Sequence, residues 1–300
     1  LIHYADLTDG GTCDSLTWAL VQDGTLTISG NGAVSYSNDA PWFPYRKQIT
    51  AVVLEPGVTG IGDSAFSEYS SLTGVTISES VTSIGASAFY ECSNLTSVTI
   101  PEGVTSIGAS AFYECSGLTD VTIREGATSI GERTFSGCSN LTSVTMPESV
   151  TSIGTWAFSG CTSLTSVTIP EGVTEIAGGA FYGCTGLESV HLPEGLLSIA
   201  AHPDNYGYYA GAFEDCTSLK SVAIPASVTS IGADAFYGCT SLTSVTISEG
   251  VTEIAGGAFY RCTSLERVTL PEGLLEIEYY NIGGNNYGAF GDCTSLKSIV

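Results

Sequence analysis

Few residues in this chain have the types and spacing that catalysis or metal binding requires. The three histidines, His3, His191 and His202, are scattered along 300 residues. No G-x-S-x-G, H-E-x-x-H or phosphate-binding loop accompanies them. Ten cysteines occur without a C-x-x-C pair, so the usual spacing of a zinc site is missing. We therefore expect a protein that is not an enzyme and that holds no cofactor and no metal ion.

Residues suited to binding are concentrated in two segments rich in tyrosine, asparagine and glycine, near 201–210 and 278–288. Tyrosine offers a large amphipathic contact area at low entropic cost, and asparagine offers adaptable hydrogen bonding. The candidate binding residues in these segments are Tyr206, Tyr208, Tyr209, Tyr279, Tyr280, Tyr287 and Asn285. The alternative is that both segments fold over their own tyrosines, as compact surface loops do.

A second set of candidates is charged and lies in the second half of the chain. In the first half, the outward positions of the predicted strands hold mostly threonine and serine. In the second half, the equivalent positions hold charged residues, several of them basic. These candidates are Glu188, His191, Lys220, Glu266 and Arg267. Such a face can recognise a protein partner. The alternative is a solvated surface with cross-strand ion pairs, such as Glu188 beside Lys220.

The overall charge limits the classes of partner. With 31 acidic and 8 basic residues the net charge is −23, whereas nucleic-acid binding needs a basic surface. No run of 18 apolar residues occurs, so we expect no membrane insertion. We also expect no signal peptide in this sequence. Because the chain begins at Leu1 and ends inside a predicted strand at Val300, we expect a trimmed product whose fold continues further.

A repeat of fixed length must position all of these residues. Ten phenylalanines mark it, and seven of the nine intervals between them are 23 residues, the other two being 32 and 31. These anchors are Phe66, Phe89, Phe112, Phe135, Phe158, Phe181, Phe213, Phe236, Phe259 and Phe290. A fixed period in this range is typical of a solenoid. The two longer intervals contain the tyrosine-rich segments, which are therefore inserts.

Residues 95–115 show how one repeat forms a coil. The pattern L-x-x-V-x-I predicts a strand with Val98 and Ile100 on one face, and Pro101-Glu102-Gly103 predicts a turn. Val104 and Ile107 form an apolar pair on the return path. Nine cysteines, each three residues after an anchor phenylalanine, form one column. We expect them to pack as small hydrophobic residues, although pairing between neighbours is an alternative.

The first 48 residues do not follow the repeat. Alternating apolar residues on both sides of Asp23-Gly24 predict a β-hairpin, with Trp18, Leu20, Leu26 and Ile28 facing inward. An aromatic cluster follows at 41–45. We interpret the segment as a cap over the first coil and divide the chain into this cap, 1–48, and a repeat array, 49–300, of ten coils plus a partial one.

The two inserts belong to a larger duplication. The segment Glu171–Phe181 is repeated without change at Glu249–Phe259, three coils later. We therefore expect both inserts on the same edge of the array, roughly 15 Å apart at ~4.8 Å per coil.

The unit L-x-x-V-x-I-P-x-x-V-x-x-I-G-x-x-A-F-x-x-C, as in 95–115, resembles the BspA-type leucine-rich repeat, over about residues 49–300. The resemblance implies a β-rich right-handed superhelix, with a parallel sheet along one face and short turns or 3-10 elements elsewhere. It also implies a secreted or surface protein of a host-associated bacterium, since some members of the family bind host matrix proteins.

These observations together predict an extracellular, non-catalytic, monomeric module. Its function would be to bind proteins or glycans of a host, including adhesion to host surface or matrix components. The alternative is a structural spacer that presents another domain without a ligand of its own. Exposed insert tyrosines would favour binding, and buried ones would favour the spacer.

Overall fold

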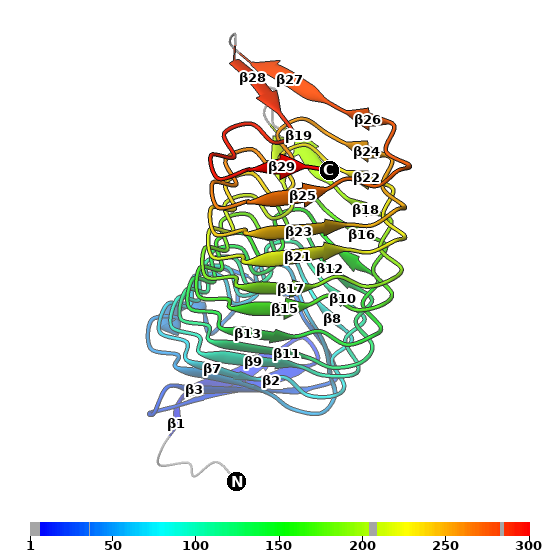
Figure 1. Cartoon of the computed structure of the whole chain (residues 1–300). Helices are drawn as coiled ribbons and strands as arrows, with labels where there is room; N and C mark the ends of the chain where they lie inside the picture. Colours follow the sequence, from blue (N-terminus) through cyan, green and yellow to red (C-terminus); the bar gives the residue numbers. More distant parts are fainter. Residues whose placement is uncertain (1–6, 36, 204–208, 283–284) are drawn as a thin grey trace. The chain divides into compact units, whose positions relative to one another are not determined.

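The computed structural model describes residues 7–35, 37–203, 209–282 and 285–300. The chain forms two compact units, Leu1–Pro147 and Glu148–Val300, each made of stacked coils (Figure 1). The described residues contain many short strands and no α-helix, and the 3-10 helix η2 (Phe43–Tyr45) follows the N-terminal strands. None of their helices is long and apolar enough to span a membrane. The predicted β-rich solenoid is confirmed.

The N-terminal strands form the predicted hairpin. β1 (Leu7–Cys13), β2 (Leu16–Val21) and β3 (Thr25–Gly30) pair antiparallel. The β2–β3 turn is closed by a bond from the Gly24 amide to the Val21 carbonyl at 3.0 Å, and Gly24 has φ +86°. Trp18, Leu20, Leu26 and Ile28 are buried, as predicted. β3 then pairs parallel with the first strand of the array.

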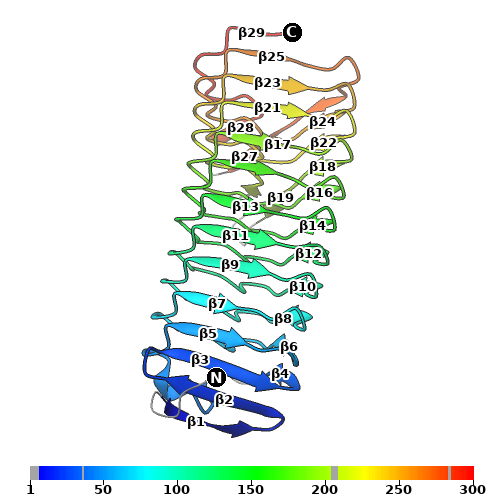
Figure 2. The same cartoon turned by 90° about the horizontal axis from the view of Figure 1, so that it is seen from below.

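Unit 1 continues as a parallel sheet, with one strand from each coil (Figure 2). Its array strands are β5 (Ala51–Leu54), β7 (Gly74–Thr76), β9 (Ser97–Ile100), β11 (Asp120–Ile123) and β13 (Ser143–Thr145). The return path of each coil adds β4 (Gly32–Val34), β6 (Val58–Ile61), β8 (Ser83–Ile84), β10 (Ser106–Ile107) and β12 (Ser129–Ile130). Equivalent residues face each other, such as Val98, Val121 and Val144.

Unit 2 repeats this arrangement. Its array strands are β15 (Ser166–Thr168), β17 (Ser189–His191), β21 (Ser221–Ile224), β23 (Ser244–Ile247), β25 (Arg267–Thr269) and β29 (Ser298–Ile299). Its return strands are β14 (Ser152–Ile153), β16 (Glu175–Ile176), β18 (Ser198–Ile199), β22 (Ser230–Ile231), β24 (Glu253–Ile254) and β26 (Glu276–Ile277). The third side of each coil is a run of turns that carries the anchor phenylalanine.

Columns of identical residues form the core of each unit. The rings of Phe213, Phe236 and Phe259 stack with centroids 5.3 Å apart. Eight of the nine column cysteines are buried, which confirms the predicted packing. Their thiols also satisfy backbone groups: Cys239 Sγ, for example, donates to the Phe213 carbonyl at 3.3 Å. Burial raises the pKa of the Cys92 thiol to about 12, so it is a poor nucleophile.

The outward threonines bond neighbouring coils together. Thr96 Oγ1 donates to the Thr73 carbonyl, and Thr119 Oγ1 to the Thr96 carbonyl, both at 3.1 Å. Each side chain therefore satisfies a main-chain acceptor of the preceding coil. The threonine rows stabilise the stack, which accounts for them without a ligand.

Candidate functional site

The tyrosine-rich inserts form two β-hairpins in unit 2. β19 (Ala201–Pro203) pairs antiparallel with β20 (Tyr209–Gly211), and β27 (Tyr279–Ile282) pairs antiparallel with β28 (Asn285–Gly288). The rings of Tyr209 and Tyr280 lie with centroids 5.8 Å apart. This contact places both inserts on the same edge, as the duplication predicts.

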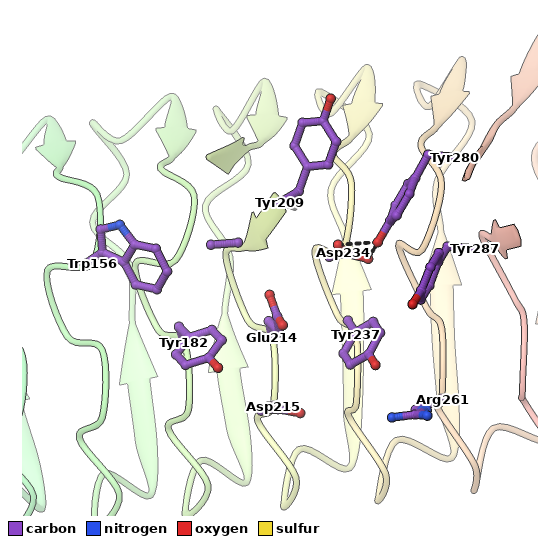
Figure 3. A pocket seen from close by; sticks show the side chains of 11 residues that line it. Trp156, Tyr182, Tyr209, Glu214, Asp215, Asp234, Tyr237, Arg261, Tyr280 and Tyr287 are labelled. Atoms are coloured by element: carbon purple, nitrogen blue, oxygen red, sulfur yellow. Dashed lines mark hydrogen bonds between the residues drawn. The ribbon is translucent and has the colours of Figure 1, made fainter. Parts of the chain in front are cut away.

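A groove of about 590 Å³ opens below these hairpins (Figure 3). Its walls and floor combine aromatic and acidic side chains with one arginine. The lining residues are Trp156, Tyr182, Tyr209, Ala210, Glu214, Asp215, Asp234, Tyr237, Arg261, Tyr280 and Tyr287. All of them belong to unit 2.

The repeat explains how residues far apart in sequence line one groove. The position after the anchor phenylalanine is Tyr182, Glu214 and Tyr237 in three successive coils. These side chains therefore stand in one row, with the carboxyl between two phenol rings (Figure 3). Trp156 and Asp234 share another column, two residues before the anchor. The array thus supplies the floor, and the insert hairpins supply Tyr209, Tyr280 and Tyr287.

One buried acid joins the floor to an insert. Asp234 is 4% exposed, and its carboxylate accepts hydrogen bonds from the Tyr280 hydroxyl at 2.5 and 2.7 Å (Figure 3). Burial raises the pKa of Asp234 to about 6, although the Tyr280 hydrogen bond acts in the opposite direction. Burial and the Asp234 contact raise the pKa of Tyr280, so this phenol is protonated and acts as the donor.

Glu214 is the most perturbed of the three acids. Its pKa is raised to about 8, chiefly by burial; a hydrogen bond from the Gly211 amide lowers the pKa, and the charges of Asp234 and Asp215 raise it. That bond to Oε2 is 3.0 Å long. Burial also raises the pKa of Asp215, against the effect of Arg261. A carboxyl group in a desolvated site near other acids retains its proton.

Glycines of the following coils make room for these side chains. A Cβ atom on Gly179 would lie 2.7 Å from the Trp156 ring, and one on Gly257 would lie 1.9 Å from Asp234 Oδ1. Asp215 lies over Gly238 in the same manner, since a Cβ atom there would lie 2.2 Å from Asp215 Oδ1. Each of these three groove side chains therefore lies over a residue without a side chain.

Arg261 closes one end of the groove. Its guanidinium carbon lies 5.9 Å from the ring centroid of Tyr237 and 5.7 Å from that of Tyr260. Its Nε also lies 3.9 Å from Asp292 Oδ2. Both distances lie within the cation–π limit of about 6 Å, so Tyr237 of the groove already contacts one guanidinium group.

The structure brings part of the predicted binding set together. Tyr209, Tyr280 and Tyr287 line the groove, and Tyr279 is 70% exposed on β27. Asn285 lies on β28. Tyr206 and Tyr208 lie outside the described residues.

The charged candidates lie elsewhere, on the strand side of the coils. Lys220 forms an ion pair with Glu188, and Lys297 pairs with Glu266 at 3.1 Å. His191 ends β17 and Arg267 begins β25, both exposed. The pairing of Lys220 with Glu188 is the one expected for a solvated surface, so the structure does not join this set to the tyrosines.

Sequence reasoning missed eight of the eleven groove residues. Tyr182 and Tyr237 hold the tyrosine that is common in their column, and Ala210 belongs to an insert. The other five are exceptions in their columns: Trp156, Glu214, Asp215, Asp234 and Arg261. A signal for them exists in the repeat. Their columns usually hold serine, tyrosine, glutamate or glycine, and each of the five residues differs from the usual residues of its own column. All five lie in the coils from that of Phe158 to that of Phe259. Comparing each column for exceptions, rather than only the inserts and the strand face, identifies them.

The groove offers two kinds of contact. Six aromatic rings offer stacking surfaces, and the acids offer hydrogen-bond acceptors or negative charge. Among the described residues, no three His, Cys, Asp or Glu side chains are placed to hold a metal ion.

Comparison with known proteins identifies the repeat. The family model described as BspA type leucine rich repeat region matches residues 40–165, 105–203 and 208–300. A crystal structure of a leucine rich cell surface protein from Faecalibacterium prausnitzii A2-165 is 30% identical, with a TM-score of 0.50, over 98% of this chain and 95% of that one. No curated protein matches significantly.

Two further solved structures share the fold. A leucine-rich repeat protein from Eubacterium ventriosum ATCC 27560 is 22% identical over 95% of each chain, with a TM-score of 0.51. The pneumococcal vaccine antigen PcpA is 16% identical, with a TM-score of 0.53, over 98% of this chain and 82% of that one.

Proposed function

Because this chain belongs to the BspA type leucine-rich repeat family, we propose that it is a non-catalytic binding module that works outside the cell. Its ligand site is the groove of unit 2, and its partner is a protein or glycan of a host surface or matrix. The similar F. prausnitzii protein is described as a cell surface protein, which supports this location.

The single observation that carries the proposal is the placement of the insert tyrosines. Tyr209 is 39% and Tyr279 is 70% exposed, while Tyr280 and Tyr287 are half-buried along an open groove. A spacer without a ligand would cover such rings, because exposed aromatic surface is costly in water. A binding site needs accessible aromatic rings, and those of Tyr209 and Tyr279 are accessible.

The strand face of unit 2 is a second contact surface in this proposal. Its charged side chains, including His191 and Arg267, stand exposed beside the ion pairs of Lys220 and Lys297. Exposed ion pairs contribute little to stability, so this face is free to adapt to a partner. The module acts as a monomer.

A matched pair of variants tests the proposal. Tyr182 and Tyr113 occupy the same column, but Tyr182 lines the groove of unit 2, whereas Tyr113 belongs to unit 1 and stacks on Tyr90 with centroids 5.0 Å apart. Binding to an array of host matrix proteins and glycans should fall at least tenfold in Tyr182→Ser and stay unchanged in Tyr113→Ser. Equal binding by both variants and the natural chain would remove the groove from the function and favour the spacer.

A further inference from the structure

The acids of the groove have too few positive partners within it. Three carboxyl side chains line the site, Glu214, Asp215 and Asp234, together with one cation, Arg261. Arg261 is held at one end by the Tyr237 and Tyr260 rings and lies near Asp292. It acts electrostatically on Asp215, whereas the charges that act on Glu214 are those of Asp234 and Asp215, both negative.

The rings around these acids suit a cation. Tyr182 and Tyr237 flank Glu214 in one row, and Tyr209 and Tyr280 lie above them (Figure 3). Ring faces attract ammonium and guanidinium groups, most strongly where water is excluded. The contact of Arg261 with Tyr237 is an example between two residues that line the same groove.

We propose that the groove binds a basic side chain, arginine or lysine, presented by a protein partner. This inference rests on the proposed function and names the chemistry of the ligand. A neutral sugar would stack on the rings but would neither offset the charge of Asp234 nor displace the proton of Glu214. A cation would meet rings and carboxylates together, and the net charge of −23 would attract a basic partner from solution.

The protonation of Glu214 gives the proposal a pH dependence. The other charged and titratable groups that line the groove are Asp215, Asp234, Arg261, Tyr182, Tyr209, Tyr237, Tyr280 and Tyr287. Because the pKa of Glu214 is about 8 in the free groove, a cation must displace its proton at neutral pH. An arginine side chain does not titrate below about pH 12, so its affinity should rise between about pH 6 and 9 as Glu214 ionises.

The probe is a blocked peptide with three arginines separated by glycine and serine. Its control has citrulline, the neutral isostere of arginine, at the same positions. Calorimetric titration of the whole chain in 0.15 M salt should show binding of the arginine peptide and at least tenfold weaker binding of the citrulline peptide. A neutral oligosaccharide panel is titrated in parallel.

Two variants separate the groove from the general negative charge. Glu214→Gln keeps an acceptor for the Gly211 amide, and Glu114→Gln removes one acid from unit 1. Each substitution removes one carboxyl group, and the titrations are made at about pH 9, above the Glu214 pKa of about 8, so that the Glu214 carboxyl carries its charge. We expect Glu214→Gln to weaken arginine-peptide binding at least tenfold and Glu114→Gln less than twofold. Tyr182→Leu should also weaken it tenfold, against Tyr113→Leu as its control.

Each other result overturns the inference. Equal losses in Glu214→Gln and Glu114→Gln would mean diffuse surface attraction, and equal affinity for both peptides would mean that charge is not recognised. Neutral oligosaccharides that bind through Tyr182 in place of the peptide would overturn the cation and leave the proposed function intact. Failure of Tyr182→Ser to reduce binding to any array partner would remove the proposed function itself.

Discussion

At the scale of single residues, the hydrogen bond between Tyr280 and Asp234 fixes an insert to the array. Tyr280→Phe removes the donor to a carboxyl group that is 4% exposed. A buried acceptor that loses its partner costs about 1–3 kcal/mol. We expect the free energy of unfolding of unit 2, measured by urea denaturation, to fall by that amount.

The neighbouring Tyr279 provides the control, since its side chain is 70% exposed. Tyr279→Phe should change the free energy of unfolding by less than about 0.5 kcal/mol, as surface substitutions usually do. Equal effects of the two substitutions would show that the bond to Asp234 does not stabilise the hairpin.

The acid in the aromatic row makes stability depend on pH. Burial raises the pKa of Glu214 from 4.5 to about 8, so the folded state holds a proton that the unfolded chain releases. Its contribution is therefore fully present below pH 4.5 and is lost as pH rises towards 8. At ~1.4 kcal/mol per pKa unit, reduced for partial solvent screening, we expect unit 2 to lose about 2 kcal/mol between about pH 5 and 8.

The same substitution that tests binding tests this dependence. Glu214→Gln holds no titrating proton at this position, so its unfolding free energy should fall less steeply with pH over this range. At about pH 9, above the Glu214 pKa of about 8, where the natural carboxyl has lost most of its proton, we expect Glu214→Gln to be more stable than the natural chain. Parallel pH profiles of the two proteins would exclude Glu214 as the source.

At the scale of elements, the groove depends on turns that leave space. Gly257 and Gly183 both have positive φ, +72° and +67°, and six other coils have non-glycine residues such as Ser110 at the position of Gly257. The left-handed backbone alone therefore tolerates a side chain at a cost of roughly 1 kcal/mol. Gly257 and Gly183 therefore differ in the space that a Cβ atom would find, not in their backbone conformation.

Alanine at the two positions separates strain from space. The Cβ of Gly257→Ala would lie 1.9 Å from Asp234 Oδ1, whereas that of Gly183→Ala would have its nearest neighbour at 4.0 Å. We expect Gly183→Ala to cost about 1 kcal/mol and Gly257→Ala about 2 kcal/mol more, because Asp234 must leave Tyr280. Equal losses on urea denaturation would mean that the groove floor is not tightly packed.

At the scale of the whole chain, the repeat predicts far more than the site. The 23-residue period determines which residues share a column, so the buried Phe and Cys columns and the inward face of the hairpin were predictable. The insert hairpins were predictable only as loops, since pairing such as Tyr280 with Tyr287 depends on local register. The acids were missed because Glu214 and Asp234 are unusual only when each is compared with the residues at the same position of the other coils.

The division of the chain at residue 48 stays a prediction.

Stacking also determines how far a destabilising substitution affects the other coils of its unit. In a solenoid each coil contacts mainly its neighbours, so stability is close to a sum of coil and interface terms. Phe236 is fully buried and stacks on Phe213 and Phe259, with centroids 5.3 Å apart on each side. Phe236→Ala should cost about 3–5 kcal/mol.

Amide hydrogen exchange can locate that loss. Exchange should accelerate most between residues 213 and 259 and least near 165 in the same unit, because distant coils keep their own interfaces. The control is Phe290→Ala, whose half-buried ring stacks on Phe259 at 5.3 Å, and we expect a loss of about half that size. Uniform acceleration across unit 2 in Phe236→Ala would instead mean that its coils unfold only as one cooperative block.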